Sequence, residues 1–135
     1  MLALISPAKK LDALSEVLSE PKINDYSEPR FLEETAELVK TLKSKSRGDL
    51  KSLMNISDNL ADLNYERYQQ FQPDFDLSNA KQAVLVFQGD TYKGLDADNL
   101  SEDDLKYAQD HLRILSGLYG ILRPLDLMQP YRLEM

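Results

Sequence analysis

The stretch from Leu115 to Met135, LSGLYGILRPLDLMQPYRLEM, sets glycines, prolines and arginines into an otherwise apolar run. Gly117 is placed to end a preceding helix in the left-handed conformation. The turn 117–120 exposes backbone amides, which hold a phosphate well when a second helix begins nearby. Such an arrangement, here near residues 102–129, is the hypothesis of a helix-hairpin-helix-like element. On residue types alone the favoured interpretation is a helix cap followed by a buried strand over 118–122.

The rest of the chain alternates helical patterns with polar turns. Apolar side chains recur at helical spacing in four segments. Ser57 and Ser101 are typical N-caps at the start of two of them, and Asp104 completes a capping-box pattern with Ser101. The patterns predict helices over residues 31–42, 49–56, 58–71 and 102–115, with a weaker helix over 11–18.

Two short apolar runs have the length of strands. Leu2–Ser6 (LALIS) is ended by Pro7, which cannot donate a hydrogen bond to a sheet. Ala83–Phe87 (AVLVF) is apolar throughout and predicts a strand that is buried on both faces. Several helices with a small mixed sheet indicate the α/β class, and α+β is the alternative.

Composition restricts the class of protein. With 135 residues the chain is long enough for one domain. It contains no cysteine, which excludes disulfides, thiolate metal sites and thiol redox chemistry within these residues. No apolar run approaches the ~18 residues of a membrane span, and the N-terminus lacks the charge order of a signal peptide. We expect a cytoplasmic protein with no membrane partner.

The net charge of −7 argues against a simple polyanion binder, because nucleic-acid-binding proteins usually carry a basic surface. The charge is uneven, however. Residues 96–110 contain six acids and one lysine, whereas residues 111–135 contain three arginines and two acids. The acids suit the first turn of a helix, and the basic end keeps nucleic-acid binding open.

Two polar turns are candidate sites besides the glycine turn. Ser6 and Lys9 have a Ser-x-x-Lys spacing, in which a desolvated lysine can activate the hydroxyl, although a strand-ending turn with a solvated lysine is the alternative. Asp90 and Lys93 follow the second apolar run, where ligands bind in open α/β sheets; an ordinary connection is the alternative. His111, the single histidine, fits a structural role better than a metal site. We predict no metal site and no cofactor.

Four motifs in one order carry a resemblance to a known family. HLRILSGLYGILRPLDLMQPYRLEM, from His111 onward, resembles the central signature of the bacterial YaaA family of peroxide-stress proteins. SPAK at Ser6–Lys9, ISDNLA at Ile56–Ala61 and FQGDTYKGL at Phe87–Leu95 are similar to the other motifs of that family.

This resemblance implies a DNA-binding protein that protects against hydrogen peroxide by limiting harmful intracellular iron. It also implies an unusual α/β fold with a basic cleft and a helix-hairpin-helix element. Members of the family continue beyond RLEM, so residues 1–135 resemble the N-terminal part of a single domain that is truncated at its C-terminus. Core surface exposed by that truncation favours dimerisation of the fragment, and its oligomeric state is otherwise open.

The first hypothesis is a non-enzymatic protein that binds duplex DNA through phosphates, with little sequence preference. Its predicted contacts are Lys9, Lys10, Lys93, Arg113, Gly117, Gly120, Arg123 and Arg132. The alternative hypothesis is an enzyme of unknown reaction. Its catalytic candidates are Ser6, Lys9 and Asp90, in a pocket formed by the SPAK and QGDTY loops.

Overall fold

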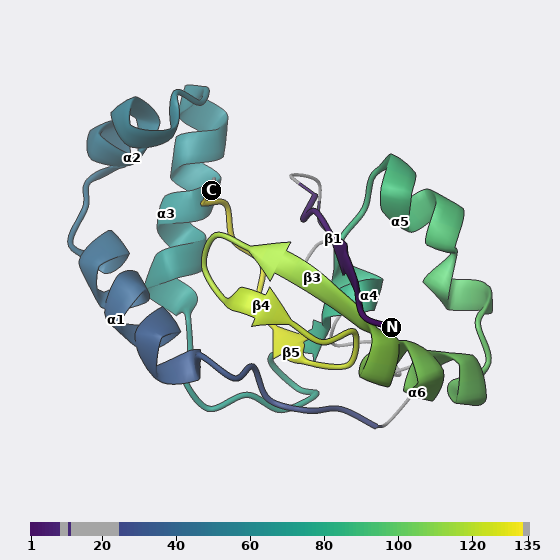
Figure 1. The fold of residues 1–135 in the computed structure, drawn as a ribbon. Helices are drawn as coiled ribbons and strands as arrows, with labels where there is room; N and C mark the ends of the chain where they lie inside the picture. The colour runs from purple at the N-terminus through teal and green to yellow at the C-terminus, as the bar shows by residue number, and fades with distance from the viewer. Residues whose placement is uncertain (9–10, 12–24, 134–135) are drawn as a thin grey trace.

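A computed structural model describes residues 1–8, 11 and 25–133 of the chain. Short strands alternate with helices along this part of the sequence (Figure 1). The elements are β1 (Ala3–Ile5), α1 (Leu32–Lys43), α2 (Arg47–Met54), α3 (Asp58–Gln70), β2 (Lys81–Gln82), α4 (Ala83–Val86), α5 (Asp90–Leu95), the 3-10 helix η2 (Ala97–Asn99), α6 (Glu102–His111), β3 (Leu112–Ser116), β4 (Gly120–Leu122) and β5 (Leu127–Met128).

The central feature is a mixed sheet with the strand order β1-β3-β4. β1 runs parallel to β3 and pairs Leu4 with Arg113, whereas β4 runs antiparallel to β3 and pairs Ile121 with Leu115. β2 and β5 form a separate antiparallel pair. Helices with a small mixed sheet confirm the predicted α/β class.

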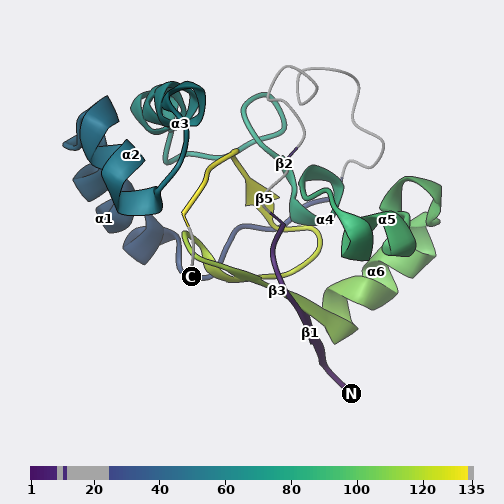
Figure 2. The ribbon, with the colours of Figure 1, turned by 90° about the horizontal axis from the view of Figure 1, so that it is seen from above.

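The helices lie in two groups on either side of this sheet. Figure 2 shows α1, α2 and α3 together at one side and α4, α5 and α6 at the other. The larger hydrophobic cluster joins the first group to the sheet, with Leu50, Ile114 and Leu122 fully buried within it. A smaller cluster holds the second group together through Val84, Leu85, Ala97, Leu105 and Leu125.

The predicted helices over 31–42, 49–56 and 58–71 are confirmed as α1, α2 and α3, within a few residues at each end. The helices α2, α3 and α6 each begin at a serine that caps the first turn. The Ser57 hydroxyl accepts a hydrogen bond from the Leu60 amide, and Ser101 and Asp104 form the predicted capping box at the start of α6. The predicted helix over 11–18 lies outside the described residues except for Leu11, which forms an isolated antiparallel bridge with Phe87.

The predicted strand over Ala83–Phe87 is wrong, although the run is buried as expected. Ala83–Val86 forms the helical turn α4. Its first amides are satisfied by a neighbouring segment, because the Ala83 N–H donates to the Asp126 carbonyl at 2.8 Å and the Val84 N–H to that of Pro124 at 3.1 Å. An apolar run that is buried all round carries no periodicity that distinguishes a helical turn from a strand.

The helix-hairpin-helix-like element predicted near residues 102–129 is also wrong. α6 ends at His111, because the next five residues pair with β1 and β4 as strand β3. A strand, β4, stands where a second helix was expected, so the region is a helix followed by a β-hairpin. The alternative of a buried strand after the turn is the closer description. The left-handed glycine in this stretch is Gly120, with φ +78°, and not Gly117.

None of the helices in the described part of the chain combines the length and the apolar character that crossing a membrane requires.

Candidate functional site

The β3–β4 hairpin is closed by a three-residue turn between Ser116 and Gly120, which pair across the strands. A left-handed residue after such a turn is the usual way to match the twist of the strands. Gly120 supplies it, and a Cβ at this position would lie 3.2 Å from the ring of Phe31. A glycine is therefore required at position 120 for two reasons: the positive φ of the backbone and the close approach of the Phe31 ring.

The turn itself is built into the core. Its Leu118 and Tyr119 side chains are buried. The Tyr119 N–H donates to the Ser116 hydroxyl oxygen at 3.0 Å, and the Thr35 hydroxyl of α1 donates to the Leu118 carbonyl at 3.0 Å. The glycine turn is thus anchored to the first helix, and these contacts are made inside the chain.

A group of tyrosine hydroxyls fastens the hairpin to the segment after β5. Tyr131 and Ser116 share a hydrogen bond of 2.6 Å between their hydroxyls, and the Tyr119 hydroxyl donates to the Gln129 carbonyl at 3.2 Å. The rings of Tyr119 and Tyr131 meet edge to face, with centroids 5.5 Å apart. Burial raises the pKa of Tyr131 to about 12 and raises that of Tyr119 further. These hydroxyls are therefore neutral structural donors at physiological pH.

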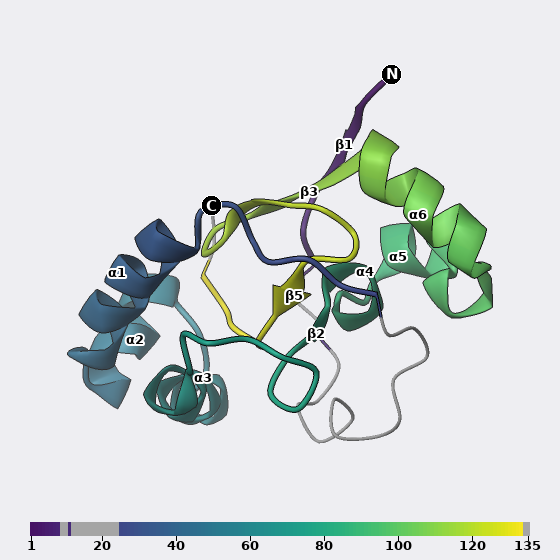
Figure 3. The same cartoon turned by 90° about the horizontal axis from the view of Figure 1, so that it is seen from below.

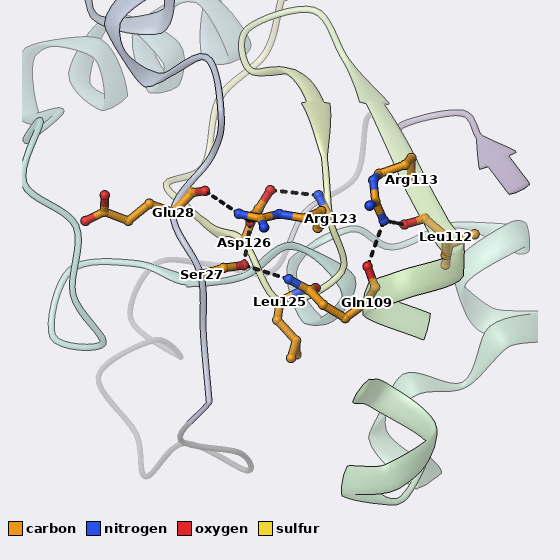
Figure 4. Close-up of polar contacts among 8 residues, drawn as sticks. All are labelled: Ser27, Glu28, Gln109, Leu112, Arg113, Arg123, Leu125 and Asp126. Carbon is orange, nitrogen blue, oxygen red and sulfur yellow. Dashed lines mark hydrogen bonds and ion pairs between the residues drawn. The ribbon is translucent and has the colours of Figure 1, made fainter. Parts of the chain in front are cut away.

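Two of the predicted arginines lie next to each other on the outer face of the sheet. Ile114 and Leu122 pair with each other and are buried against the core. Side chains alternate between faces along a strand, so the residue before Ile114 points outward. Continuing the register by one residue places Arg123 opposite Arg113, as Figure 4 shows.

Each of these arginines is held by partners within the chain (Figure 4). Arg123 donates through Nε to the carboxylate of Asp126 at 3.0 Å and through Nη2 to the Glu28 carbonyl at 2.9 Å. Arg113 donates through Nη1 to the carbonyls of Gln109 and Leu112, at 2.7 and 2.8 Å. Their guanidinium groups are consequently fixed in direction before any ligand arrives.

The carboxylate of Asp126 organises this region, and sequence analysis did not identify it. Its side chain is 0% exposed and accepts from the Ser27 hydroxyl at 2.5 Å and from the Arg123 backbone N–H at 2.7 Å. Gln109 extends the network: its amide nitrogen donates to the Ser27 hydroxyl, and its oxygen accepts from the Leu125 N–H. The spacing of Arg123 and Asp126 by three residues is the one local signal that was available.

The other predicted DNA contacts lie elsewhere. Lys93 is an exposed residue of α5, on the other side of the sheet from α1–α3 (Figure 1). Arg132 is half-buried, and its carbonyl accepts a hydrogen bond from the Tyr68 hydroxyl. Lys9 and Lys10 lie outside the described residues. The structure therefore brings Arg113, Arg123 and the glycine turn together in one hairpin and separates Lys93 from them.

A cleft of about 450 Å³ lies beside the QGDTY loop. Phe87, Gly89, Asp90, Tyr92 and Lys93 are among the residues that line it. Asp90 and Lys93 are exposed, whereas Tyr92 is buried with its ring stacked on Phe87 at 5.4 Å between centroids. The cleft thus combines an aromatic wall with two carboxylates, Asp90 and Asp96, and the amine of Lys93.

The SPAK loop contacts the QGDTY loop, although none of its described residues, Ser6 to Ala8, is among those that line the cleft. The Tyr92 hydroxyl donates to the Ser6 carbonyl at 2.5 Å, and burial raises the pKa of Tyr92. Gly89 has φ +121°, and a Cβ there would lie 3.6 Å from the Cβ of Ala8. Ser6 itself is exposed. Among the residues that the structure describes, no group of three or more His, Cys, Asp or Glu side chains could hold a metal ion.

The contact between these loops joins two of the motifs noted in the sequence, and comparison with known proteins identifies them. A family model described as peroxide stress protein YaaA matches residues 1–135. The chain belongs to the YaaA family. The signature from His111 onward thus forms the β3–β4 hairpin, and the SPAK and FQGDTYKGL motifs meet through the hydrogen bond between Tyr92 and Ser6.

Curated relatives match the whole length of this YaaA family member. A protein named UPF0246 protein from Cupriavidus metallidurans is 53% identical over 135 residues, which are 100% of this chain and 50% of the relative. One from Albidiferax ferrireducens is 56% identical, again over 100% of this chain and 51% of the relative. The chain thus spans about half the length of the curated relatives it matches.

Proposed function

We propose that the full-length protein is a cytoplasmic DNA-binding protein of the peroxide-stress response, which binds duplex phosphates with little sequence preference and limits damage from intracellular iron. Family membership supports the link to peroxide stress. The observation that carries DNA binding within this chain is the pair of neighbouring arginines, Arg113 and Arg123, on the outer face of the sheet.

The pair suits phosphate because its guanidinium groups are already positioned. The contacts found among the described residues use Nη1 of Arg113 and leave its Nε and Nη2 available to a phosphate oxygen. The contacts of Arg123 use its Nε and Nη2, and they leave its Nη1 available to a phosphate oxygen. A planar group that is fixed in advance loses little conformational entropy when it binds. Contacts to phosphates alone carry no sequence information.

Iron protection would follow from the same contacts. Cations such as Fe(II) gather around the phosphates of DNA, and a protein that neutralises phosphates releases them. Fe(II) displaced from the duplex no longer generates radicals beside the bases when peroxide arrives. This chain has a net charge of −7, so we expect the remaining half of the full-length protein to contribute most of the positive surface.

The test is fluorescence anisotropy of a labelled duplex at several salt concentrations, with this chain and the full-length C. metallidurans relative side by side. Binding should weaken steeply with salt. Arg113→Ala should lower the affinity and reduce the slope of log K against log salt by about one. The matched control is Arg47→Ala. Arg47 is exposed on α2, where it pairs with Asp62 and Glu66 of α3.

Three results are informative. If both proteins bind and only Arg113→Ala weakens binding, the hairpin is part of the interface. Binding by the relative alone would assign the phosphate contacts to the half outside this chain. DNA binding as a function is excluded if neither protein binds at low salt.

A second proposal, an enzyme or small-molecule site, is favoured by the hydrogen bond between Tyr92 and Ser6, which holds the SPAK and QGDTY loops together at the cleft. Asp90 and Lys93, which line the cleft, would then contact the ligand, and Ser6 and Lys9 of the SPAK motif are the further catalytic candidates. A metabolite library screened by thermal shift tests this proposal. Asp90→Asn should abolish a stabilising hit, whereas Asp76→Asn, an exposed acid outside the cleft, should keep it. Lys9→Ala should abolish turnover without changing DNA affinity.

A further inference from the structure

The outer edge of β1 has the properties of a strand that lacks a neighbour. In the order β1-β3-β4, β1 is an edge strand, and no other strand of the described residues pairs with its outer side. Leu2 and Leu4 are 54% and 59% exposed. The sequence MLALI carries no charged side chain. Soluble proteins usually protect such edges with charges, proline, a bulge or a covering element.

β1 is exposed on both of its faces. Ala3 and Leu4 point to opposite faces of the sheet, yet both residues are exposed. Their partners on the adjacent strand, Leu112 and Arg113, are half-buried, whereas Ile5 pairs with the fully buried Ile114. Figure 3 shows the N-terminal end of β1 extending beyond both groups of helices. The outermost strand therefore combines an edge without a partner strand among the described residues with two exposed leucines, Leu2 and Leu4.

We propose that a strand from the half of the full-length chain that lies outside residues 1–135 pairs with the free edge of β1 and extends the sheet to four strands. The relatives are about twice as long as this chain, so each of them has a further covalently linked segment from which such a strand can come. Residues 1–135 are then the first part of one larger domain whose sheet is shared between the halves.

A linked strand fits this edge better than a second copy of the chain. β1 has three residues, so pairing through it buries little area, whereas stable complexes between separate proteins bury more than about 1,000 Å². A segment of the same chain is presented at a high effective concentration and needs no such area. The edge also presents unpaired backbone donors and acceptors, which a strand satisfies and a helix does not.

The experiment compares residues 1–135 alone with the same residues joined to the half of the C. metallidurans relative that lies outside the match. The chain has no cysteine, so single thiols can be introduced without background from residues 1–135. Leu4→Cys reports on the edge. Leu53→Cys in α2 is the matched control, because Leu53 is 61% exposed on an element distant from β1. Maleimide labelling at each position is followed by peptide mass spectrometry, and backbone hydrogen exchange is measured on the peptide 1–6.

We expect both thiols to react quickly in residues 1–135 alone. In the joined protein, Leu4→Cys should be protected by at least about tenfold, since a buried site reacts only through its open state. Leu53→Cys should react at an unchanged rate, and amides of the peptide 1–6 should exchange more slowly. Equal reactivity of Leu4→Cys in the two proteins overturns the proposal. So does slow exchange of this peptide in monomeric residues 1–135, because the edge would then be covered from within.

Two further measurements complete the test. One asks whether a second copy of the chain covers the edge, and the other can be made even if the joined protein does not fold. Sedimentation of residues 1–135 shows whether they self-associate. A dimer in which Leu4→Cys is protected would assign the edge to a second copy and would exclude the linked strand. The intact C. metallidurans relative needs no engineering, and its N-terminal strand should show slow hydrogen exchange. Fast exchange there contradicts the proposal.

Discussion

Among single polar side chains, Asp126 is the one whose replacement should lower the free energy of unfolding the most. It is fully buried and accepts hydrogen bonds from Ser27 and from the backbone and side chain of Arg123. Removing one partner of such a buried pair leaves the other uncompensated, and Asp126→Ala should lower the free energy of unfolding by about 3 kcal/mol. Urea denaturation at neutral pH measures this loss.

The control for Asp126 is an ion pair on the surface. Lys51 and Asp58 are 2.8 Å apart, but the Asp58 side chain is 82% exposed. Solvent screens such a pair, so Asp58→Ala should cost less than about 1 kcal/mol. Similar losses for the two variants would show that Asp126 is not the organising residue of the hairpin.

The buried tyrosines predict how stability changes at high pH. Burial disfavours the phenolate and raises the pKa of Tyr131 from its ordinary value of 10.0 to about 12 in the folded protein. Between pH 10 and 12 the unfolded chain therefore binds fewer protons than the folded one. The free energy of unfolding should be constant below pH 10 and fall above it, by about 1.4 kcal/mol per pH unit for this tyrosine. Tyr68, Tyr92 and Tyr119 have raised pKa values as well and add to the fall.

Urea midpoints measured from pH 9 to 11.5 test this prediction. Tyr131→Phe should make the decline shallower. Tyr107→Phe is the matched control, because Tyr107 is exposed on α6 and its replacement should leave the decline unchanged. A wild-type midpoint that does not move above pH 10 contradicts the predicted sign.

Local residue pairs could be predicted from the sequence, and distant ones could not. The capping box of Ser101 and Asp104 joins residues three positions apart, so the pattern itself shows both partners. Ser27 and Asp126 are separated by 99 positions, and Gln109 and Ser27 by 82. Nothing in the sequence pairs a loop serine with an acid so far away. The network behind Arg123 therefore emerges only from the fold.

At the scale of elements, the β3–β4 hairpin gives the sharpest prediction. Gly120→Ala should destabilise the protein by about 1–2 kcal/mol, the cost of a left-handed conformation with a Cβ. Contact of that Cβ with the Phe31 ring adds to the loss. Gly48→Ala is the control, because Gly48 lies in α2 without a positive φ and a Cβ there contacts nothing closer than 3.8 Å. It should stabilise the protein by up to about 1 kcal/mol.

Thermal and urea unfolding of both glycine variants decide this comparison. A Gly120→Ala protein as stable as Gly48→Ala would mean that the hairpin turn tolerates another conformation. The prediction from sequence placed the left-handed residue at Gly117, because a helix was expected to continue to residue 115. The end of the helix at His111 moved this requirement to the far end of the turn.

The elements that the sequence predicted well are those that depend on their own residues. α1, α2 and α3 have amphipathic patterns, α2 and α3 also begin at serine caps, and all three formed as expected. Residues 112–115 continue the helical spacing of α6 but form β3, because β1 and β4 offer hydrogen-bonding partners on both sides. Ala83–Val86 forms a helical turn for a similar reason. Both errors arose where distant segments decided between two structures that the local pattern allowed.

The same distinction applies to the candidate site. The alternative hypothesis placed the SPAK and QGDTY loops side by side, and the hydrogen bond from Tyr92 to Ser6 joins them, although the run before the QGDTY loop is the helical turn α4 and not the expected strand. Tyr92 could not be assigned as the residue that joins them, since its partner is a backbone carbonyl 86 positions away. The hairpin arginines were identified by residue type, but their directions depend on Asp126 and Gln109.

For the whole molecule, the two hydrophobic clusters suggest two regions that can loosen separately. Leu105 of α6 belongs to the smaller cluster, and Leu50 of α2 belongs to the larger one that includes the sheet. Each is almost fully buried, so replacement by alanine should cost about 2–5 kcal/mol in either case. Matched burial makes the two variants a controlled pair.

Hydrogen exchange followed by mass spectrometry separates the two regions. In Leu105→Ala, exchange should accelerate in α4, η2 and α6, while α1–α3 keep their protection, because local opening spreads only through shared contacts. Leu50→Ala should accelerate exchange in α1–α3 and in the β3–β4 hairpin, which Thr35 ties to α1. An identical, chain-wide change in both variants would show that the described residues open as one cooperative unit. Separate responses would mean that the region of α4, η2 and α6 can loosen while α1–α3 stay folded.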